Sequence, residues 1–225
     1  GKGRFCLHDL VVVQIREGCI MTKKETILKL VNRVLDGTDL ILSVDSYQLE
    51  ELLETSEVKI TCQVHHQKTG ARSVIEGVGV GIVDAFFHGF VEMYSKEFPS
   101  LNTIKFVDFS VSATIDNRDE GWGCDSIAEV KLHVENSDGH VFPFAHKSPS
   151  ITRSCIDAVL QAGEFFINSE RAFIAVYKAL QHARESGRSD SVSDYTNYLT
   201  TLVSATSYTE VIDRVKREEL SDLEE

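Results

Sequence analysis

One supersecondary unit occurs twice in this chain, and this duplication constrains the fold more than any other feature. The first copy spans Ser56–Phe90 and the second spans Ala128–Gly163. Each copy opens on Glu-Val-Lys plus an aliphatic residue, and continues as an alternating strand to a polar turn that ends in glycine. A second strand, a short loop and an apolar helix are expected next in both copies. A duplication of this length predicts two copies of one unit that pack together.

A further strand precedes each copy and completes a βββα pattern. Phe5–Arg16 is rich in β-branched and apolar residues, and Ile104–Ile115 is a clear strand before the second copy. The return strands and the helices are expected at Arg72–Gly77, His140–Ala145, Val83–Glu97 and Ile151–Phe166, with more helix at Arg171–His182. The sequence therefore predicts an α+β fold of two βββα units, with antiparallel sheets, helices on one side of them, and extra helices.

Residues 19–55 are predicted to form a helical insertion before the first copy. Thr22 and Glu25 have the spacing of a capping box, and apolar residues follow them at helical intervals. A second helix is expected from Asp45 to Glu54.

Residues 184–194 are small, polar and charged, which is typical of a linker. Short amphipathic helices are expected after them. We therefore expect an α+β domain at residues 1–183, which includes the insertion, and a linker with a helical tail at residues 184–225.

Composition narrows the functional classes. The chain has 225 residues, a net charge of −12 and a pI near 5.1, which argues against nucleic acid and anionic membrane surfaces as partners. Its five cysteines are odd in number and include no Cys-x-x-Cys pair, so a reducing, cytoplasmic location is expected. No apolar run approaches the length of a membrane span, and no signal peptide is visible.

The sharpest local motif is the glycine-rich loop before the first predicted helix. Glycines alternate in it, so the backbone can approach a ligand closely, and the helix start offers free N–H groups to a carboxylate. An ordinary strand-to-helix turn remains the alternative. The expected loop residues are Gly77, Gly79, Val80, Gly81, Ile82, Val83, Asp84 and Ala85.

The equivalent loop before the second helix is an ordinary cap when it is taken alone. Ser148 or Ser150 can cap the helix, and Pro149 suits a helix start. It is informative because the duplication makes it the counterpart of the first loop. The expected loop residues are Ser148, Pro149, Ser150, Ile151 and Thr152.

These two segments, GVGVGIVDAFFHGF and SPSITRSCIDAVLQAGEFFINS, resemble the signature segments of the C-terminal regulatory domain of 2-isopropylmalate and citramalate synthases. The resemblance covers about Val58–Ser169 and the strand at Phe5–Arg16. It implies two βββα units related by a pseudo-twofold axis, a homodimer, and binding of leucine, isoleucine or a related acid near the two loops, with feedback inhibition as the result. A catalytic barrel would then be a partner of this domain.

The chain departs from the family pattern at three loop positions. Val80 replaces a residue that is often Asn or Pro, Ile82 replaces the usual Pro, and His146 stands where glycine is common. These changes re-shape the pocket that the resemblance implies. A ligand-free interaction scaffold of the same fold is therefore the alternative function.

No catalytic or metal site is predicted. The eight histidines contain no His-x-His pair, and no P-loop, His-Glu-x-x-His or Gly-x-Ser-x-Gly motif is present, so no cofactor is expected. The catalytic part of such synthases is a TIM barrel, which this chain is too short to add. An independent enzyme is the third hypothesis, with Asp84, His88 and His146 in a pocket between the loops.

Overall fold

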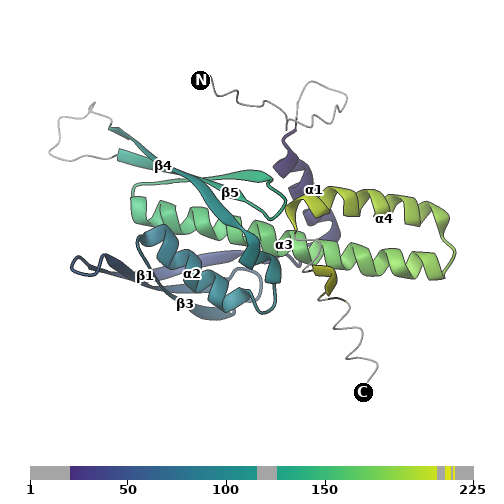
Figure 1. Ribbon diagram of the computed structural model, residues 1–225, viewed down its shortest axis with the longest axis horizontal. Coiled ribbons are helices and arrows are strands. Elements are labelled where there is room, and N and C mark those ends of the chain that lie inside the picture. The colour runs from purple at the N-terminus through teal and green to yellow at the C-terminus, as the bar shows by residue number, and fades with distance from the viewer. Residues whose placement is uncertain (1–20, 116–125, 207–210, 214, 216–225) are drawn as a thin grey trace, which may run out of the picture.

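The computed structural model describes residues 21–115, 126–206, 211–213 and 215 (Figure 1). The strand predicted at Phe5–Arg16 lies outside these residues. Two three-stranded antiparallel sheets have the strand orders β1-β2-β3 and β4-β5-β6, and each sheet is followed by a helix. The prediction of an α+β fold with two βββα units is therefore confirmed. The first unit contains β1 (Leu42–Leu52), β2 (Glu57–His66), β3 (Arg72–Gly79) and α2 (Ile82–Tyr94), and the second contains β4 (Lys105–Ile115), β5 (Ser126–Glu135), β6 (Val141–Ser148) and α3 (Ile151–Glu185).

Further elements in the described part of the chain flank or connect these units. Helix α1 (Lys23–Leu35) precedes the first unit, and the 3₁₀ helix η1 (Pro99–Thr103) connects the two units. Helix α4 (Ser189–Leu202) and the 3₁₀ turn η2 (Val203–Ala205) follow α3. Within the described residues, no helix is both long enough and apolar enough to span a bilayer.

The hydrogen-bond register supports the duplication and corrects its alignment. The β1–β2 ladder shifts just after the pair Val44–Val64, and the β4–β5 ladder shifts just after the pair Phe106–Val134. Each unit therefore carries one β-bulge at the same place. In this register Val58 corresponds to Ala128, two positions from its match in the repeated Glu-Val-Lys. Because side chains alternate along a strand, a shift of two residues leaves every side chain on its own face.

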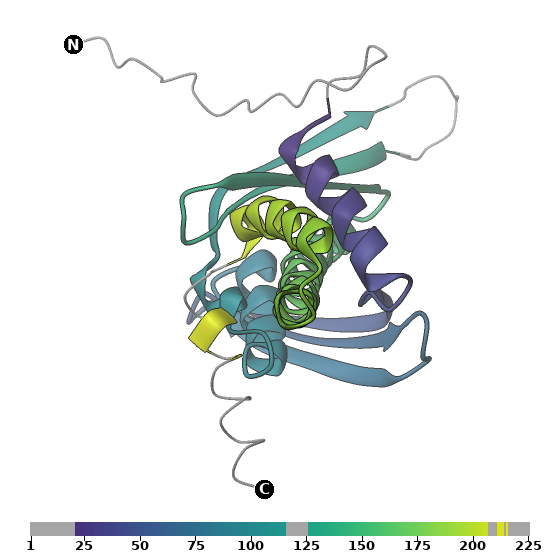
Figure 2. The ribbon, with the colours of Figure 1, turned by 90° about the vertical axis from the view of Figure 1, so that its right-hand side faces the viewer.

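The helices α2 and α3 lie between the two sheets (Figure 2). Helix α2 packs on β2 and β3, α3 packs on β5 and β6, and the two helices contact each other. The inward-facing strand residues and the helix phenylalanines form one core, which includes Ile60, Cys62, Val64, Val130, Leu132, Val134, Phe86, Phe90, Phe165 and Phe166. Each sheet thus has its helix on one side, as predicted. The packing of the helices between the sheets fixes the positions of the loops that precede both helices.

The predicted helix at Asp45–Glu54 is wrong, because this segment belongs to strand β1. Leu49 pairs with Ile60 and Tyr47 pairs with Cys62, so a full ladder with β2 outweighs the weak local preference for helix. Only α1 remains of the predicted helical insertion. Its capping box is present, since the Glu25 amide donates to the Thr22 hydroxyl at 3.2 Å and the Glu25 carboxylate accepts from the Thr22 amide at 2.8 Å.

The predicted linker at 184–194 is mostly helical. Helix α3 runs to Glu185 and α4 begins at Ser189, so only residues 186–188 connect them. Gly187 has a φ of 66° and makes the turn possible without strain. The polar residues that suggested a linker lie on the exposed faces of the end of α3 and the start of α4. The division into domains at residue 183 stays a prediction.

Candidate functional site

The two strand-to-helix junctions are structurally equivalent. Strand β3 ends at Gly79 and α2 begins after the N-cap residue Gly81, whereas β6 ends at Ser148 and α3 begins after the N-cap residue Ser150. Helices α2 and α3 run in the same direction, so both junctions lie at the same end of the helix pair (Figure 1). The loops predicted from sequence therefore occupy matching positions in the two units.

Two glycines of the first junction allow the helix to pack directly on its own strand. A Cβ atom at Gly77 would lie 1.9 Å from the carbonyl oxygen of Ala85, and one at Gly79 would lie 2.5 Å from the Ala85 amide nitrogen. On the helix side of the same contact lies Gly89, where a Cβ atom would lie 2.4 Å from the carbonyl oxygen of Glu76. These glycines are required by helix-on-strand packing, whatever else the loop does.

Gly81 is different, because nothing lies within 4 Å of the position of its missing Cβ. As the N-cap residue it provides no side-chain acceptor for the first amides of α2. Asp84 turns back instead, and its carboxylate accepts a hydrogen bond of 3.0 Å from the amide of Val80. The same carboxylate lies 3.4 Å from the imidazole of His88. The first junction thus combines open helix amides with one partly exposed carboxylate.

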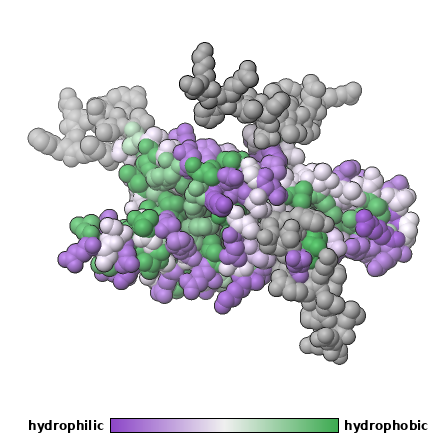
Figure 3. All heavy atoms as spheres, viewed as in Figure 1, coloured by the Kyte–Doolittle hydropathy of each residue, from purple (hydrophilic) through white to green (hydrophobic). Residues whose placement is uncertain are grey.

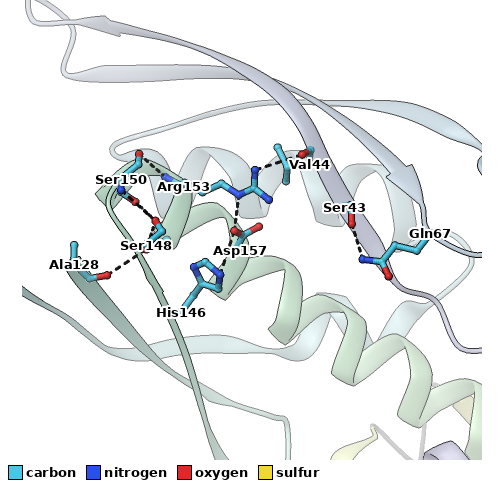
Figure 4. Close-up of polar contacts among 10 residues, drawn as sticks. Ser43, Val44, Gln67, Ala128, His146, Ser148, Ser150, Arg153 and Asp157 are labelled. Carbon is cyan, nitrogen blue, oxygen red and sulfur yellow. Dashed lines mark hydrogen bonds and ion pairs between the residues drawn. The ribbon is translucent and has the colours of Figure 1, made fainter. Parts of the chain in front are cut away.

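The second junction satisfies its own amides. The hydroxyl of Ser150 accepts from the Arg153 amide at 3.2 Å, and the hydroxyl of Ser148 accepts from the Ser150 amide at 3.2 Å (Figure 4). Pro149 and Ile151 are exposed and Thr152 is half-buried. This loop is a well-formed helix cap, and it offers a ligand fewer free donors than the first.

Three pockets lined by described residues lie elsewhere, and none of the predicted loop residues lines them. The trio Asp84, His88 and His146 of the enzyme hypothesis is also divided between two pairs. Asp84 pairs with His88 on α2, whereas His146 on β6 lies 3.5 Å from Asp157 on α3.

A groove along α3 contains candidate functional residues that the sequence analysis did not identify. Two adjoining cavities of about 240 and 290 Å³ share Ile41, Gln161 and Glu164. The groove is bounded by α3, by residues 39–43 before and at the start of β1, by β6 and by α1. A polar stripe at helical spacing within the apolar helix could have identified it, namely Arg153, Asp157, Gln161, Glu164 and Asn168.

At one end of the groove, Arg153 joins both units. Its Nε donates to the Asp157 carboxylate at 2.5 Å, and its Nη1 donates to the carbonyl of Val44 in β1 at 3.4 Å (Figure 4). His146 contacts the same carboxylate of Asp157. A single helix thereby ties the two sheets together through charged groups.

In the middle of the groove lies Glu164, a carboxyl group with a strongly altered ionisation. Burial raises its pKa to about 7, the nearby charges of Asp157 and Asp39 add to the rise, and a hydrogen bond from the Leu42 amide at 2.5 Å opposes it. At the other end, burial lowers the pKa of Lys24 to about 8. The Lys24 ammonium donates to the Pro143 carbonyl at 2.6 Å and lies 3.9 Å from the ring centre of Phe144.

Cysteine and metal chemistry find little support in the part of the chain that is described. Burial raises the pKa of both Cys62 and Cys155 to about 11, so neither forms a thiolate near neutral pH. Among the described residues, no three His, Cys, Asp or Glu side chains gather closely enough to hold a metal ion.

Comparison with known proteins relates the chain to an enzyme family. A probable 2-isopropylmalate synthase of Archaeoglobus fulgidus is 26% identical over 120 residues. The match covers 53% of this chain but 22% of that relative, so the chain corresponds to only a small part of the length of the relative. No protein-family model matches the chain. The match supports relatedness to 2-isopropylmalate synthases without showing which of their domains is involved.

Proposed function

We propose that this chain is an amino-acid-sensing regulatory and dimerisation domain of the 2-isopropylmalate synthase type, without the catalytic barrel. The observation that carries the proposal is the pair of equivalent strand-to-helix junctions at one end of α2 and α3. The relatedness to a probable 2-isopropylmalate synthase supports it. A catalytic barrel, on the same chain or on another, would be the part that the sensor controls.

The first junction suits a zwitterion. The uncapped amides at the start of α2 favour the carboxylate of the ligand, and Asp84 beside them favours its ammonium group. Each hydrogen bond to a charged group contributes about 1.5–3 kcal/mol, and a buried branched side chain adds about 1.5–3 kcal/mol. After the costs of ordering, these terms correspond to micromolar affinity. Leucine, isoleucine, valine or the related 2-keto acids are the expected ligands.

The test is calorimetric titration of the chain with these compounds. Gly81→Val should abolish binding, because the new side chain occupies the space in front of the helix amides, and nothing lies within 4 Å of the position of its Cβ atom. Ala71→Val is a matched control, since it adds similar bulk in an exposed turn at the other end of β3. If no amino acid or keto acid binds up to millimolar concentration, the sensor proposal fails.

The packing at the junctions favours one alternative, a ligand-free scaffold of the same fold. Gly77 and Gly79 already have a structural role against α2, and the serines of the second loop already cap α3. A scaffold would bind none of the compounds above and would still dimerise. The calorimetric result therefore separates the two functions.

A homodimer is part of the proposal, and the edge strands support it. Strands β1 and β4 lie at the edges of their sheets, and Leu49 and Phe109 pair with the buried residues Ile60 and Leu132. Paired residues share a face, so Leu49 and Phe109 point toward the helix layer, yet they are 42% and 49% exposed. Figure 3 shows apolar surface over the part of the molecule where Figure 1 places β4 and β5. Uncovered apolar side chains on the inner face of the edge strand of each unit suit a symmetric second copy.

A further inference from the structure

The groove on α3 holds three carboxylates, of which one lacks a cationic partner among the described residues. Asp39 pairs with Lys68, and Asp157 pairs with Arg153. Glu164, which lies between them and lines both cavities, accepts a hydrogen bond from the neutral amide of Leu42 and forms no ion pair with any described residue. A partly buried carboxylate near two others is unfavourable in its ionised form, and either a bound proton or an approaching cation relieves that cost.

The lining of the groove also suits a ligand in which a cationic group is joined to an elongated apolar part. The cavity on the α1 side of Glu164 has an apolar wall made by Leu28, Val31, Leu40 and Phe165. Polar groups from Gln161 and Asn168 line the same space. Aliphatic surface beside an unpaired carboxylate matches an ammonium group that carries a short hydrocarbon arm.

We propose that this groove is a second binding site, which takes a small primary amine with its ammonium group on Glu164 and its aliphatic arm along α1. The site is separate from the two junctions, because none of the junction residues lines it. It therefore stands independently of the amino-acid sensor proposed above. The acidic net charge of −12 favours the approach of a cationic ligand.

Binding should strengthen as the pH rises through 7, because the amine requires ionised Glu164. With a pKa of about 7, this carboxyl is mostly protonated at pH 6 and mostly ionised at pH 8. The apparent dissociation constant scales inversely with the competent fraction, so it should fall about tenfold over that range. The titratable or charged groups that surround Glu164 are Lys24 of α1, Asp39 before β1, Tyr94 of α2, His146 of β6, and Arg153 and Asp157 of α3.

The experiment titrates the full chain with n-pentylammonium, 1-pentanol and pentanoate at pH 6 and pH 8, with calorimetry and thermal shift as readouts. Pentylammonium should bind and raise the melting temperature, more strongly at pH 8, whereas the neutral alcohol and the anion should not. Glu164→Gln should abolish the binding. It keeps the shape of the side chain and an acceptor for the Leu42 amide, so the fold should persist.

Glu92→Gln is the matched control, because Glu92 is exposed on α2 and the substitution removes the same charge. Gly81→Val should also leave amine binding intact, which separates this site from the sensor proposal. Three outcomes would overturn the inference. Pentanol could bind with the same affinity as pentylammonium, or the Glu164→Gln variant could retain the affinity for the amine. The third outcome is that the amine does not bind at 10 mM, a concentration on the order of tenfold above a millimolar dissociation constant.

Discussion

Substitution of Gly77 by alanine should separate the structural glycines of the first junction from any glycine that serves a ligand. The new methyl group would lie 1.9 Å from the carbonyl oxygen of Ala85 and 2.8 Å from the amide nitrogen of Gly89. Both are backbone atoms of α2, so no side-chain rotation can relieve the contact. The start of the helix would have to move away from β3 by roughly 1 Å or more to restore normal packing.

The expected cost follows from two terms. Overpacking a rigid site costs about 1–3 kcal/mol. Displacing α2 also reduces the burial of Phe86 and Phe90, which are fully buried and contribute about 1.5–3 kcal/mol each. We therefore expect Gly77→Ala to lower the free energy of unfolding by about 3–5 kcal/mol, a large part of the 5–15 kcal/mol that is typical of a domain.

Urea unfolding followed by circular dichroism measures this change directly. Gly81→Ala is the matched control, since open space surrounds the position and only the weak capping preference of glycine over alanine is lost, about 1 kcal/mol or less. If the free energies of unfolding of the Gly77→Ala and Gly81→Ala variants differ by less than about 1 kcal/mol, the packing explanation of Gly77 is wrong. The loop glycines would then have to be explained by a ligand.

Three other results are expected. Ser150→Ala should cost about 1 kcal/mol in urea unfolding, because it removes the acceptor of the Arg153 amide at the start of α3. The folded pKa of Glu164 is raised from 4.5 to about 7, so its contribution to stability is fully present below pH 4.5 and is lost as the pH rises through 7. Glu164→Gln should therefore become more stable relative to wild type by up to about 3 kcal/mol as the pH rises from 4.5 to 8. Sedimentation at micromolar concentration should give a particle of twice the 25.1 kDa chain mass. The double variant Leu49→Lys, Phe109→Lys should sediment as a monomer, because it places charges on the exposed apolar positions of both edge strands. A wild type that sediments as a monomer would count against the dimer.

The sequence was sufficient for the architecture because the two copies repeat the same alternation of buried and exposed residues. Val58, Ile60, Cys62 and Val64 alternate in β2 and are all buried, as the period of two requires. The segment at 45–54 was mispredicted because its few apolar residues do not distinguish a helix from an edge strand. Only pairing with β2, which is a tertiary contact, decides its conformation.

The candidate site was harder to predict, because its parts meet only in space. The glycine-rich loop is visible in the sequence, but the distinction between Gly77, which α2 requires, and Gly81, which it does not, depends on the distance between helix and strand. The groove combines α1, the start of β1, β6 and the middle of α3. Glu164 has an unusual pKa because of that burial, and no local pattern encodes it.

The register of the two units explains why the groove occurs beside only one of the two described helix-strand pairs. Gly77 of the first unit corresponds to His146 of the second, so the direct contact of α2 with β3 is replaced by an imidazole between β6 and α3. The pair Asp84–His88 corresponds to Arg153–Asp157, so the aspartate comes first in one helix and second in the other. The first unit keeps an acidic group at an open helix start, whereas the second caps its helix and turns its charges toward β1. Divergence of this kind gives one duplicated fold two chemically different sites, and the variants Gly81→Val and Glu164→Gln address them one at a time.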